Sequence, residues 1–350
     1  MRARAGTIAE RRGVRPAARP AVRPGKRGSV RPGGVAALLI ATACGGSPGS
    51  EPVRGDLTFT VMGDAPYYWH EARRYEHLVD ALNTDSLDWV IHVGDLFWKP
   101  CSEEKMRERL EVLQRIRHPV VYTPGDNEWT DCWGRREGGF VPGDRLDRLR
   151  DIYFPSPGRS LGGAPMRVVV QASDPAWPEF VEHQRWTRGG IVFATFHLVG
   201  SRNGMEEFPG RGNADDREVR RRTEAATAWL RDTFEEARAT AARAVFLMQH
   251  ADLVFEDPAD EYRRAFEPFL RTLEEEVATF DGPVLLAHGD SHEFIVDSPL
   301  IDRRTEETLD NFTRMQVMGS PEVGWVRVMV DTAGPAFSFA PRWIPALKVW

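Results

Sequence analysis

The stretch LTFTVMGD at residues 57–64 is a run of strand-forming residues that ends in a glycine and a carboxylate, and the chain repeats this pattern. The same order occurs in WVIHVGD (89–95), VVYTPGD (120–126) and VLLAHGD (284–290), while VFLMQH (245–250) ends in a histidine. Short apolar runs of this kind are typical of strands buried on both faces of a sheet. Ligands of open α/β sheets bind at the carboxyl ends of the strands, so the pattern predicts a metal site at one sheet edge.

Helical stretches separate the predicted strands. We expect helices at about 71–82, 102–117, 144–153, 215–242 and 260–279. Asp64 and Asp95 are 31 residues apart, as are Asp95 and Asp126, and this is the length of one β-α-β unit. The alternation predicts an α/β protein. Strands expected at 294–296, 312–318, 325–330 and 336–339 would close a second sheet, which gives two sheets face to face with helices outside.

The first 44 residues differ from the rest of the chain. Residues 1–34 carry ten Arg or Lys against one acid, and the apolar run VAALLIATA (35–43) leads to Cys44. This order is that of a secretory signal, and the run is too short to span a bilayer. A cysteine after small residues resembles a bacterial lipobox, which predicts lipidation of Cys44 and membrane anchoring. A plain cleaved signal, a buried thiol and a start codon assigned too far upstream are the alternatives.

Residues 45–56 contain Gly, Ser, Pro and charged residues and are expected to form a linker, with residues 57–350 as the folded domain. The chain carries a net charge of −6 and residues 1–43 carry +9, so the remainder carries −15. So acidic a protein is a poor binder of nucleic acid, and no nucleic-acid partner is expected. We expect an exported protein, periplasmic or at the cell surface; the sequence does not indicate an oligomeric state.

Cys101 and Cys132 are the only cysteines besides Cys44, and each lies just beyond a Gly-Asp fragment. Their loops would share one edge of the sheet. In an exported protein they are expected to form a disulfide that clamps two active-site loops, the alternative being two independent thiols.

The order of these fragments resembles that of the calcineurin-like metallophosphoesterases, the superfamily that includes the purple acid phosphatases. That family has a first aspartate motif, Gly-Asp, Gly-Asn-His-Asp/Glu, a later histidine and Gly-His-x-His, in this order. The resemblance extends from Leu57 to about Val330 and implies a four-layer αββα sandwich with two mixed sheets. It also implies six metal ligands: Asp64, Asp95, Asp126, His250, Asp290 and His292.

The resemblance implies hydrolysis of a small phosphomonoester or phosphodiester by a metal-bound hydroxide at a dinuclear site, without an organic cofactor. A carboxylate between two cations offsets their repulsion, and Asp95 in the middle of the set suits this bridge. Asp64 and His292 would serve one ion, and Asp126, His250 and Asp290 the other. This oxygen-rich set suits Mn²⁺, Fe²⁺, Mg²⁺ or Ca²⁺ better than Zn²⁺.

The chain departs from the family pattern in its candidate acid. Asn127 stands where the family has a histidine that contacts phosphate and protonates the leaving group, and an amide cannot give up a proton at neutral pH. Either the leaving group is a good one or another acid serves, His70 and Tyr67 being the candidates; His70 could equally be a surface residue of the first helix. Glu128 is expected to orient a metal ligand or to cap the following turn.

Two ligand positions differ as well. Pro66 stands where many members have a histidine ligand, and Trp98 stands at the place of the purple acid phosphatase tyrosine, so no Fe(III) charge-transfer site of that type is expected. The sequence is therefore compatible with two functions. The first is a metal-dependent phosphoesterase, and the second is an extracytoplasmic metal-binding or ligand-binding protein with the same fold and impaired catalysis.

Overall fold

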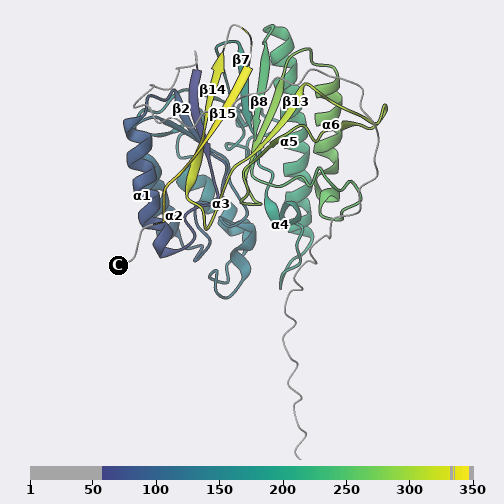
Figure 1. Ribbon diagram of the computed structural model, residues 1–350. Coiled ribbons are helices and arrows are strands. Elements are labelled where there is room, and N and C mark those ends of the chain that lie inside the picture. The colour runs from purple at the N-terminus through teal and green to yellow at the C-terminus, as the bar shows by residue number, and fades with distance from the viewer. Residues whose placement is uncertain (1–56, 332–333, 335, 347–350) are drawn as a thin grey trace, which may run out of the picture. The chain divides into compact units, whose positions relative to one another are not determined.

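Two β-sheets lie at the centre of the computed structural model, which describes residues 57–331, 334 and 336–346 (Figure 1). These residues belong to one compact unit, Pro52–Trp350. The predicted signal-like segment 1–44, with Cys44, and the predicted linker 45–56 lie outside the described residues.

The first sheet has the strand order β15-β14-β1-β2-β3-β4. Its strands are β1 (Leu57–Met62), β2 (Trp89–His92), β3 (Pro119–Tyr122), β4 (Leu161–Gly162), β14 (Gly324–Asp331) and β15 (Ala336–Trp343). β1, β2 and β3 are parallel, and the outer strands are antiparallel to their neighbours. The last residues of β1 and β2 are in register, Met62 opposite His92, so the loops that follow leave the sheet at one edge.

The second sheet has the order β10-β13-β9-β8-β7-β6-β5. Its strands are β5 (Val169–Val170), β6 (Gln184–Arg188), β7 (Ile191–Thr195), β8 (Ala244–Met248), β9 (Val284–His288), β10 (Ile295–Asp297) and β13 (Phe312–Gln316). The four central strands, β13, β9, β8 and β7, are parallel. β11 (Ile301–Asp302) and β12 (Glu307–Thr308) form a separate small hairpin.

β14 and β15 differ from the prediction, which assigned the strands at 325–330 and 336–339 to the second sheet. That assignment is wrong. β14 pairs with β1, Leu57 opposite Val330, and β15 extends the first sheet beyond it. The local pattern of apolar residues fits either sheet, and the decisive factor is that β1, buried along its whole length, has β2 on only one side. β14 satisfies the hydrogen bonds of its other side.

Helices cover the outer face of each sheet, which completes the predicted αββα sandwich (Figure 1). The helices α1 (Trp69–Thr84), α2 (Glu103–Gln114) and α3 (Pro142–Tyr153) share a core cluster with residues of β2 and β3. The helices α5 (Asn213–Ala239) and α6 (Glu267–Ala278) share another with β7, β8 and β9. The short elements are η1 (Thr130–Trp133), η2 (Gln171–Ser173), α4 (Gly200–Gly204) and η3 (Arg263–Phe266).

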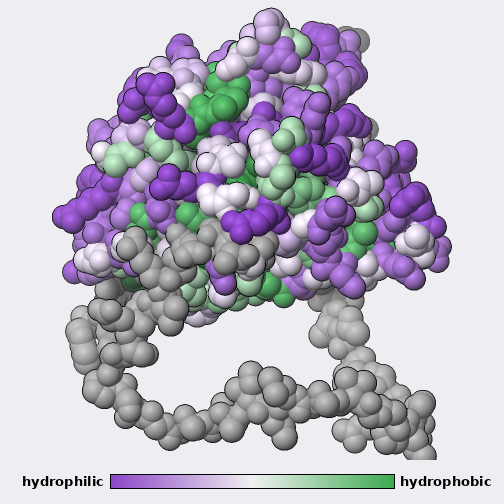
Figure 2. Space-filling view, turned by 90° about the horizontal axis from the view of Figure 1, so that it is seen from above, coloured by the Kyte–Doolittle hydropathy of each residue, from purple (hydrophilic) through white to green (hydrophobic). Residues whose placement is uncertain are grey.

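A third core cluster fills the space between the sheets. It joins side chains such as Phe59 and Ile91 of the first sheet to Phe193 and Phe246 of the second. Both faces of the central strands are therefore buried, which explains their nearly continuous apolar sequence. The face of the molecule shown in Figure 2 is mostly hydrophilic, with hydrophobic residues in small groups. None of the helices within the described ranges combines the length and the hydrophobicity needed to cross a membrane.

Candidate metal centre

The structure brings all six predicted ligands together at the carboxyl ends of parallel strands. The first three follow β1, β2 and β3 of one sheet, and the other three follow β8 and β9 of the other. They are Asp64, Asp95, Asp126, His250, Asp290 and His292. Because the sheets face each other, loops that are far apart in sequence converge on one place.

One group of ligand atoms consists of Asp126, His250 and Asp290, whose nearest ligand atoms all lie within 4.8 Å of one another. Nε2 of His250 is 2.8 Å from Oδ1 of Asp126 and 3.9 Å from Oδ1 of Asp290. This is the set that the resemblance implies for one ion.

A second group, Asp64, Asp95 and His250, also has its ligand atoms within 4.8 Å. Oδ1 of Asp95 is 3.4 Å from Nε2 of His250, and Nε2 of His292 is 3.7 Å from Oδ1 of Asp64. His250 is common to both groups, and Asp95 lies beside it in the second group.

Backbone carbonyls fix the two histidine rings. Nδ1 of His250 is 2.8 Å from the carbonyl oxygen of Val93, and Nδ1 of His292 is 2.7 Å from that of Ser320. A carbonyl oxygen only accepts, so each Nδ1 carries the hydrogen and donates it. Each Nε2 is thereby directed at the carboxylates, which is the usual arrangement of a metal-binding histidine.

Buried atoms without hydrogen bonds test whether the site fits a cation. Oδ2 of Asp64 is buried and makes no hydrogen bond, while Oδ1 of Asp126 and Nε2 of His250 are buried and face only each other, at 2.8 Å. Buried polar atoms rarely lack a partner, and each such atom calls for an explanation. All three belong to the groups above, and divalent ions would coordinate them, so the residues fit the metal that the fold implies.

The protonation of the site supports the same conclusion. Burial, with repulsion from neighbouring carboxylates, raises the pKa of Asp64 and of Asp290 to about 7. Burial would lower the pKa of His250, but the charge of Asp95 and the contact with Asp126 outweigh it and raise that pKa well above its usual value. Burial would raise the pKa of Asp126, and the contact with His250 lowers it instead. Burial thus disfavours the ionised carboxylates of Asp64 and Asp290, and a bound cation would neutralise them.

Four of the six residues have a left-handed backbone. The φ angles are 55° at Asp64, 57° at Asp95, 74° at Asp290 and 63° at His292. Few non-glycine residues adopt this conformation, and Asp and His are among those that do so most often. Such conformations cluster at functional sites, where the surrounding structure enforces them.

Glycines make room for the carboxylates. A Cβ on Gly125 would lie 2.1 Å from Oδ1 of Asp95, and one on Gly289 would lie 2.2 Å from Oδ2 of Asp64. These distances explain why a glycine accompanies the predicted ligands: a side chain there would fill the space that their oxygens occupy.

We therefore expect Gly125→Ala to weaken metal binding by at least about tenfold, since displacing a ligand costs no less than removing its supporting contacts. Isothermal titration with Mn²⁺ checks this. The matched control is Gly143→Ala in α3, because a Cβ there has nothing within 4 Å. Equal affinity of the two variants would contradict the assignment of Asp95 as a ligand.

Glu128 is fully buried and supports the loops of two ligands. Its carboxylate accepts hydrogen bonds from the backbone N–H groups of Asp95 (3.1 Å), Leu96 and Gly125 (2.9 Å). It thus holds the loop after β2 against the loop after β3. Of the two roles considered for Glu128, these contacts favour orientation of a ligand.

Asn127 contacts the central carboxylate. Its backbone N–H donates to Oδ1 of Asp95 at 3.1 Å, and its side-chain amide donates to Oδ2 at 2.6 Å. The amide therefore orients Asp95 where the family has an acid.

The two candidate acids lie in different places. The hydroxyl of Tyr67 is 2.5 Å from Oδ2 of Asp95, inside the site. The side chain of His70 is 53% exposed in the first turn of α1, where it contacts Tyr68, Trp69 and Glu71. None of these is a predicted ligand, so the surface position considered for His70 is the one observed.

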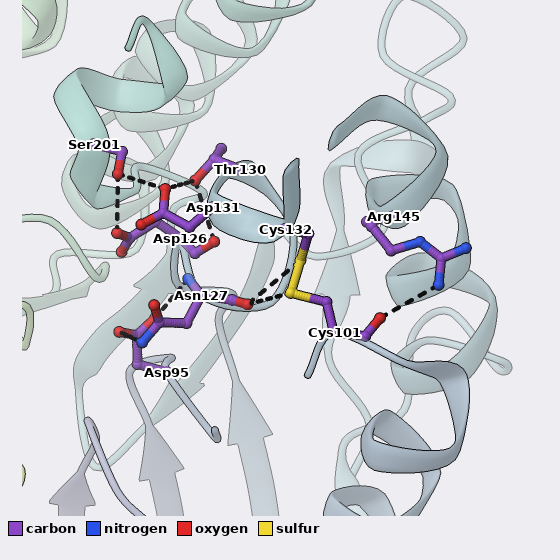
Figure 3. The surroundings of a disulfide bond; sticks show 9 residues. All are labelled: Asp95, Cys101, Asp126, Asn127, Thr130, Asp131, Cys132, Arg145 and Ser201. Atoms are coloured by element: carbon purple, nitrogen blue, oxygen red, sulfur yellow. Dashed lines mark hydrogen bonds between the residues drawn. A yellow bond between two sulfur atoms is a disulfide. The ribbon is translucent and has the colours of Figure 1, made fainter. Parts of the chain in front are cut away.

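A disulfide between Cys101 and Cys132 joins the loops after β2 and β3 (Figure 3). Both sulfur atoms contact the backbone carbonyl oxygen of Asn127, at 3.3 and 3.6 Å. The two cysteines are fully buried. The disulfide is therefore in contact with Asn127, the residue that orients Asp95.

Ser201 is a neighbour of the site that the sequence interpretation missed. Its hydroxyl is 3.3 Å from Oδ2 of Asp126 and donates to Asp131 at 2.6 Å (Figure 3). It follows Gly200, where a Cβ would lie 2.7 Å from Oδ1 of Asp126. The sequence does contain a signal, because the largely apolar run at residues 191–199 ends at Gly200.

Ser320 and Glu71 were missed too. The hydroxyl of Ser320 donates to Glu71 at 2.8 Å, and its carbonyl accepts from His292. No local pattern marks either residue.

Residues 57–294 match the family model described as calcineurin-like phosphoesterase. The structure of PhoD superposes with a TM-score of 0.51 at 14% identity, covering 85% of this chain and 73% of that chain. A purple acid phosphatase, PPD1 from seeds of yellow lupin (Lupinus luteus), gives 0.47 at 12% identity, covering 79% and 49%. No curated protein sequence matches this chain. At this identity the likeness to PhoD concerns the fold.

Proposed function

The chain belongs to the calcineurin-like phosphoesterase family, and on this premise we propose that it hydrolyses a small-molecule phosphate ester, a monoester or a diester, at a site for two divalent ions. The observation that supports this most is the convergence of buried Asp and His ligand atoms in two groups, with Oδ2 of Asp64 buried and without a hydrogen bond. When bound, two divalent ions lower the pKa of a water molecule and neutralise charge that develops on the phosphate.

The residues of the chain divide into ligands and supports in this proposal. Asp95 would contribute to holding both ions, since one of its oxygens faces His250 at 3.4 Å and the other faces Tyr67 at 2.5 Å. Asn127 and Glu128 hold it in place through hydrogen bonds to its carboxylate and its backbone. Such supporting contacts restrict a ligand to the geometry that the reaction needs.

The leaving group is the point at which the two functions differ. Asn127 cannot donate a proton to an ester oxygen, and its amide is engaged by Asp95. We infer that esters with good leaving groups are the better substrates. A protein with impaired catalysis would hold metal and turn over no ester.

The test uses the protein stripped with a chelator and reloaded with Mn²⁺, Fe²⁺, Mg²⁺, Ca²⁺ or Zn²⁺ in turn. Its substrates are 4-nitrophenyl phosphate and bis(4-nitrophenyl) phosphate, whose leaving group needs no acid. The expected result is release of nitrophenol that depends on added metal. Metal binding without turnover of either ester, with all five ions, would reject hydrolysis in favour of the binding protein.

We also propose that the protein is exported, with Cys44 as a lipidation site. The order of basic, apolar and small residues before Cys44 supports this, as does the disulfide, because disulfides persist in oxidising compartments. Expression of the full chain in a bacterium, fractionation and mass spectrometry of the amino-terminal peptide test both points. A mature chain that retains residues 1–43 and stays in the cytosol would contradict them.

A further inference from the structure

Tyr67 places an oxygen atom among the ligands of one ion. Its hydroxyl is 2.5 Å from Oδ2 of Asp95 and 3.3 Å from Nε2 of His292. The rings of Tyr67 and His292 meet edge to face, with centroids 5.3 Å apart. The phenol oxygen therefore lies between two side chains that the site offers to metal.

The atoms around this oxygen are free to coordinate. Nδ1 of His292 donates to Ser320, so its Nε2 presents a lone pair. The phenol has a single proton and faces two acceptors, Nε2 of His292 and the Asp95 carboxylate. Three electron-pair donors thus point at one small space.

The separations agree with a shared ion. Oxygen and nitrogen ligands about 2.1 Å from one ion lie roughly 3 to 4 Å from each other. The distance from the Tyr67 oxygen to Nε2 of His292 is 3.3 Å, and that from Nε2 of His292 to Oδ1 of Asp64 is 3.7 Å. The shorter contact with Asp95 is the hydrogen bond that coordination would replace.

The two expected ligand sets are unequal in number, which leaves room for a further donor at one of them. Asp126, His250 and Asp290 would hold one ion, and with Asp95 as a shared ligand that set would number four side chains. The other ion would be held by three, Asp64, His292 and Asp95, and Pro66 offers no side-chain donor. Tyr67 would bring the second set to four.

A buried network fixes Tyr67 and His292 relative to each other. The backbone N–H of Tyr67 donates to Oε2 of Glu71 at 2.7 Å, and Oε1 of Glu71 accepts from the Ser320 hydroxyl at 2.8 Å. The carbonyl of Ser320 in turn holds the His292 ring at 2.7 Å. Glu71 is fully buried. The same carboxylate thus positions the tyrosine loop and, through Ser320, the histidine.

We propose that Tyr67 is a metal ligand whose phenol oxygen binds the ion held by Asp64, Asp95 and His292. The O–H bond breaks, the proton passes to solvent, and the oxygen–metal bond forms, with no change of oxidation state. The proposal rests on the proposed function only in that the site holds metal. It replaces the role of Tyr67 as an acid for the leaving group, because a coordinated phenolate has no proton to give.

The test is the visible absorption of the protein loaded with Fe³⁺, since a phenolate bound to ferric iron gives a charge-transfer band. Wild type is expected to show the band, and Tyr67→Phe to lose it while elemental analysis still finds iron. Tyr262→Phe is the matched control, because its hydroxyl lies 3.4 Å from Oδ2 of Asp290 on the other side of the site. That variant is expected to keep the band.

A second readout uses Mn²⁺. Titration of Tyr67→Phe is expected to show one of the two ions bound at least about tenfold more weakly. The proposal for Tyr67 is overturned if iron-loaded wild type lacks the band or if the band survives in Tyr67→Phe. Neither result contradicts the proposed metal site itself. A chain that binds no metal at all overturns both the proposal for Tyr67 and the proposed function.

Discussion

Asp95→Ala is expected to abolish the binding of both ions and to lower kcat/KM for nitrophenyl esters by roughly a thousandfold or more. The physical reason is that Asp95 contacts His250, the residue common to both ligand groups, and also Asn127 and Tyr67. Two bound cations supply several kcal/mol of charge stabilisation, and each 1.36 kcal/mol corresponds to a factor of about ten in rate. Elemental analysis after gel filtration and steady-state kinetics measure the two effects.

The control for this variant is Asp80→Ala, which removes an exposed carboxylate from α1. It should keep both ions and full activity. An Asp95→Ala protein that retains two ions per chain would show that another residue bridges them.

Removal of the disulfide is expected to have the second large effect. The bond closes a loop with a sequence separation of 31 residues, and the chain-entropy relation gives about 3.7 kcal/mol for a loop of that size. The double variant Cys101→Ala/Cys132→Ala should therefore unfold at lower denaturant concentration, with a free energy of unfolding reduced by about 3 to 4 kcal/mol. Urea unfolding, in a parent that carries Cys44→Ser, measures this.

The kcat of the double variant should fall as well, by roughly tenfold, which is typical when contacts that orient a metal ligand are removed. Both sulfurs contact the carbonyl of Asn127, whose two N–H groups hold the Asp95 carboxylate. Excess Mn²⁺ should fill the metal site of the double variant again, but its kcat should stay below that of wild type. A double variant with unchanged unfolding energy and unchanged kcat would mean that the loops are held by their packing alone.

Local patterns in the sequence predicted the fold where strands are buried along their whole length. The run predicted at 57–62 is β1, with the same bounds, and the runs before Gly94, Pro124 and Gly289 are β2, β3 and β9. These strands are recognisable because both of their faces lie in a core, so all their residues except His92 and His288 are apolar or β-branched. The long helix predicted at 215–242 is α5, Asn213–Ala239.

Patterns of this kind could not predict what depends on packing between distant segments. β14 has as clear an apolar pattern as the others, yet its place beside β1 follows from an edge that only the folded sheet defines. Tyr67 and His70 are three residues apart and were equal candidates. The loop before α1 directs the tyrosine to Asp95, and the first helical turn directs the histidine to solvent.

The sequence by itself determined which chemical groups the site has and that they sit at strand ends, because a glycine and a polar residue after a buried strand form a local signal. Only the tertiary structure decided which atoms face one another. Ser320 and Glu71 are 249 residues apart and share a hydrogen bond that supports His292. Such a contact exists only when the two sheets pack and their loops meet, so no window of sequence contains it.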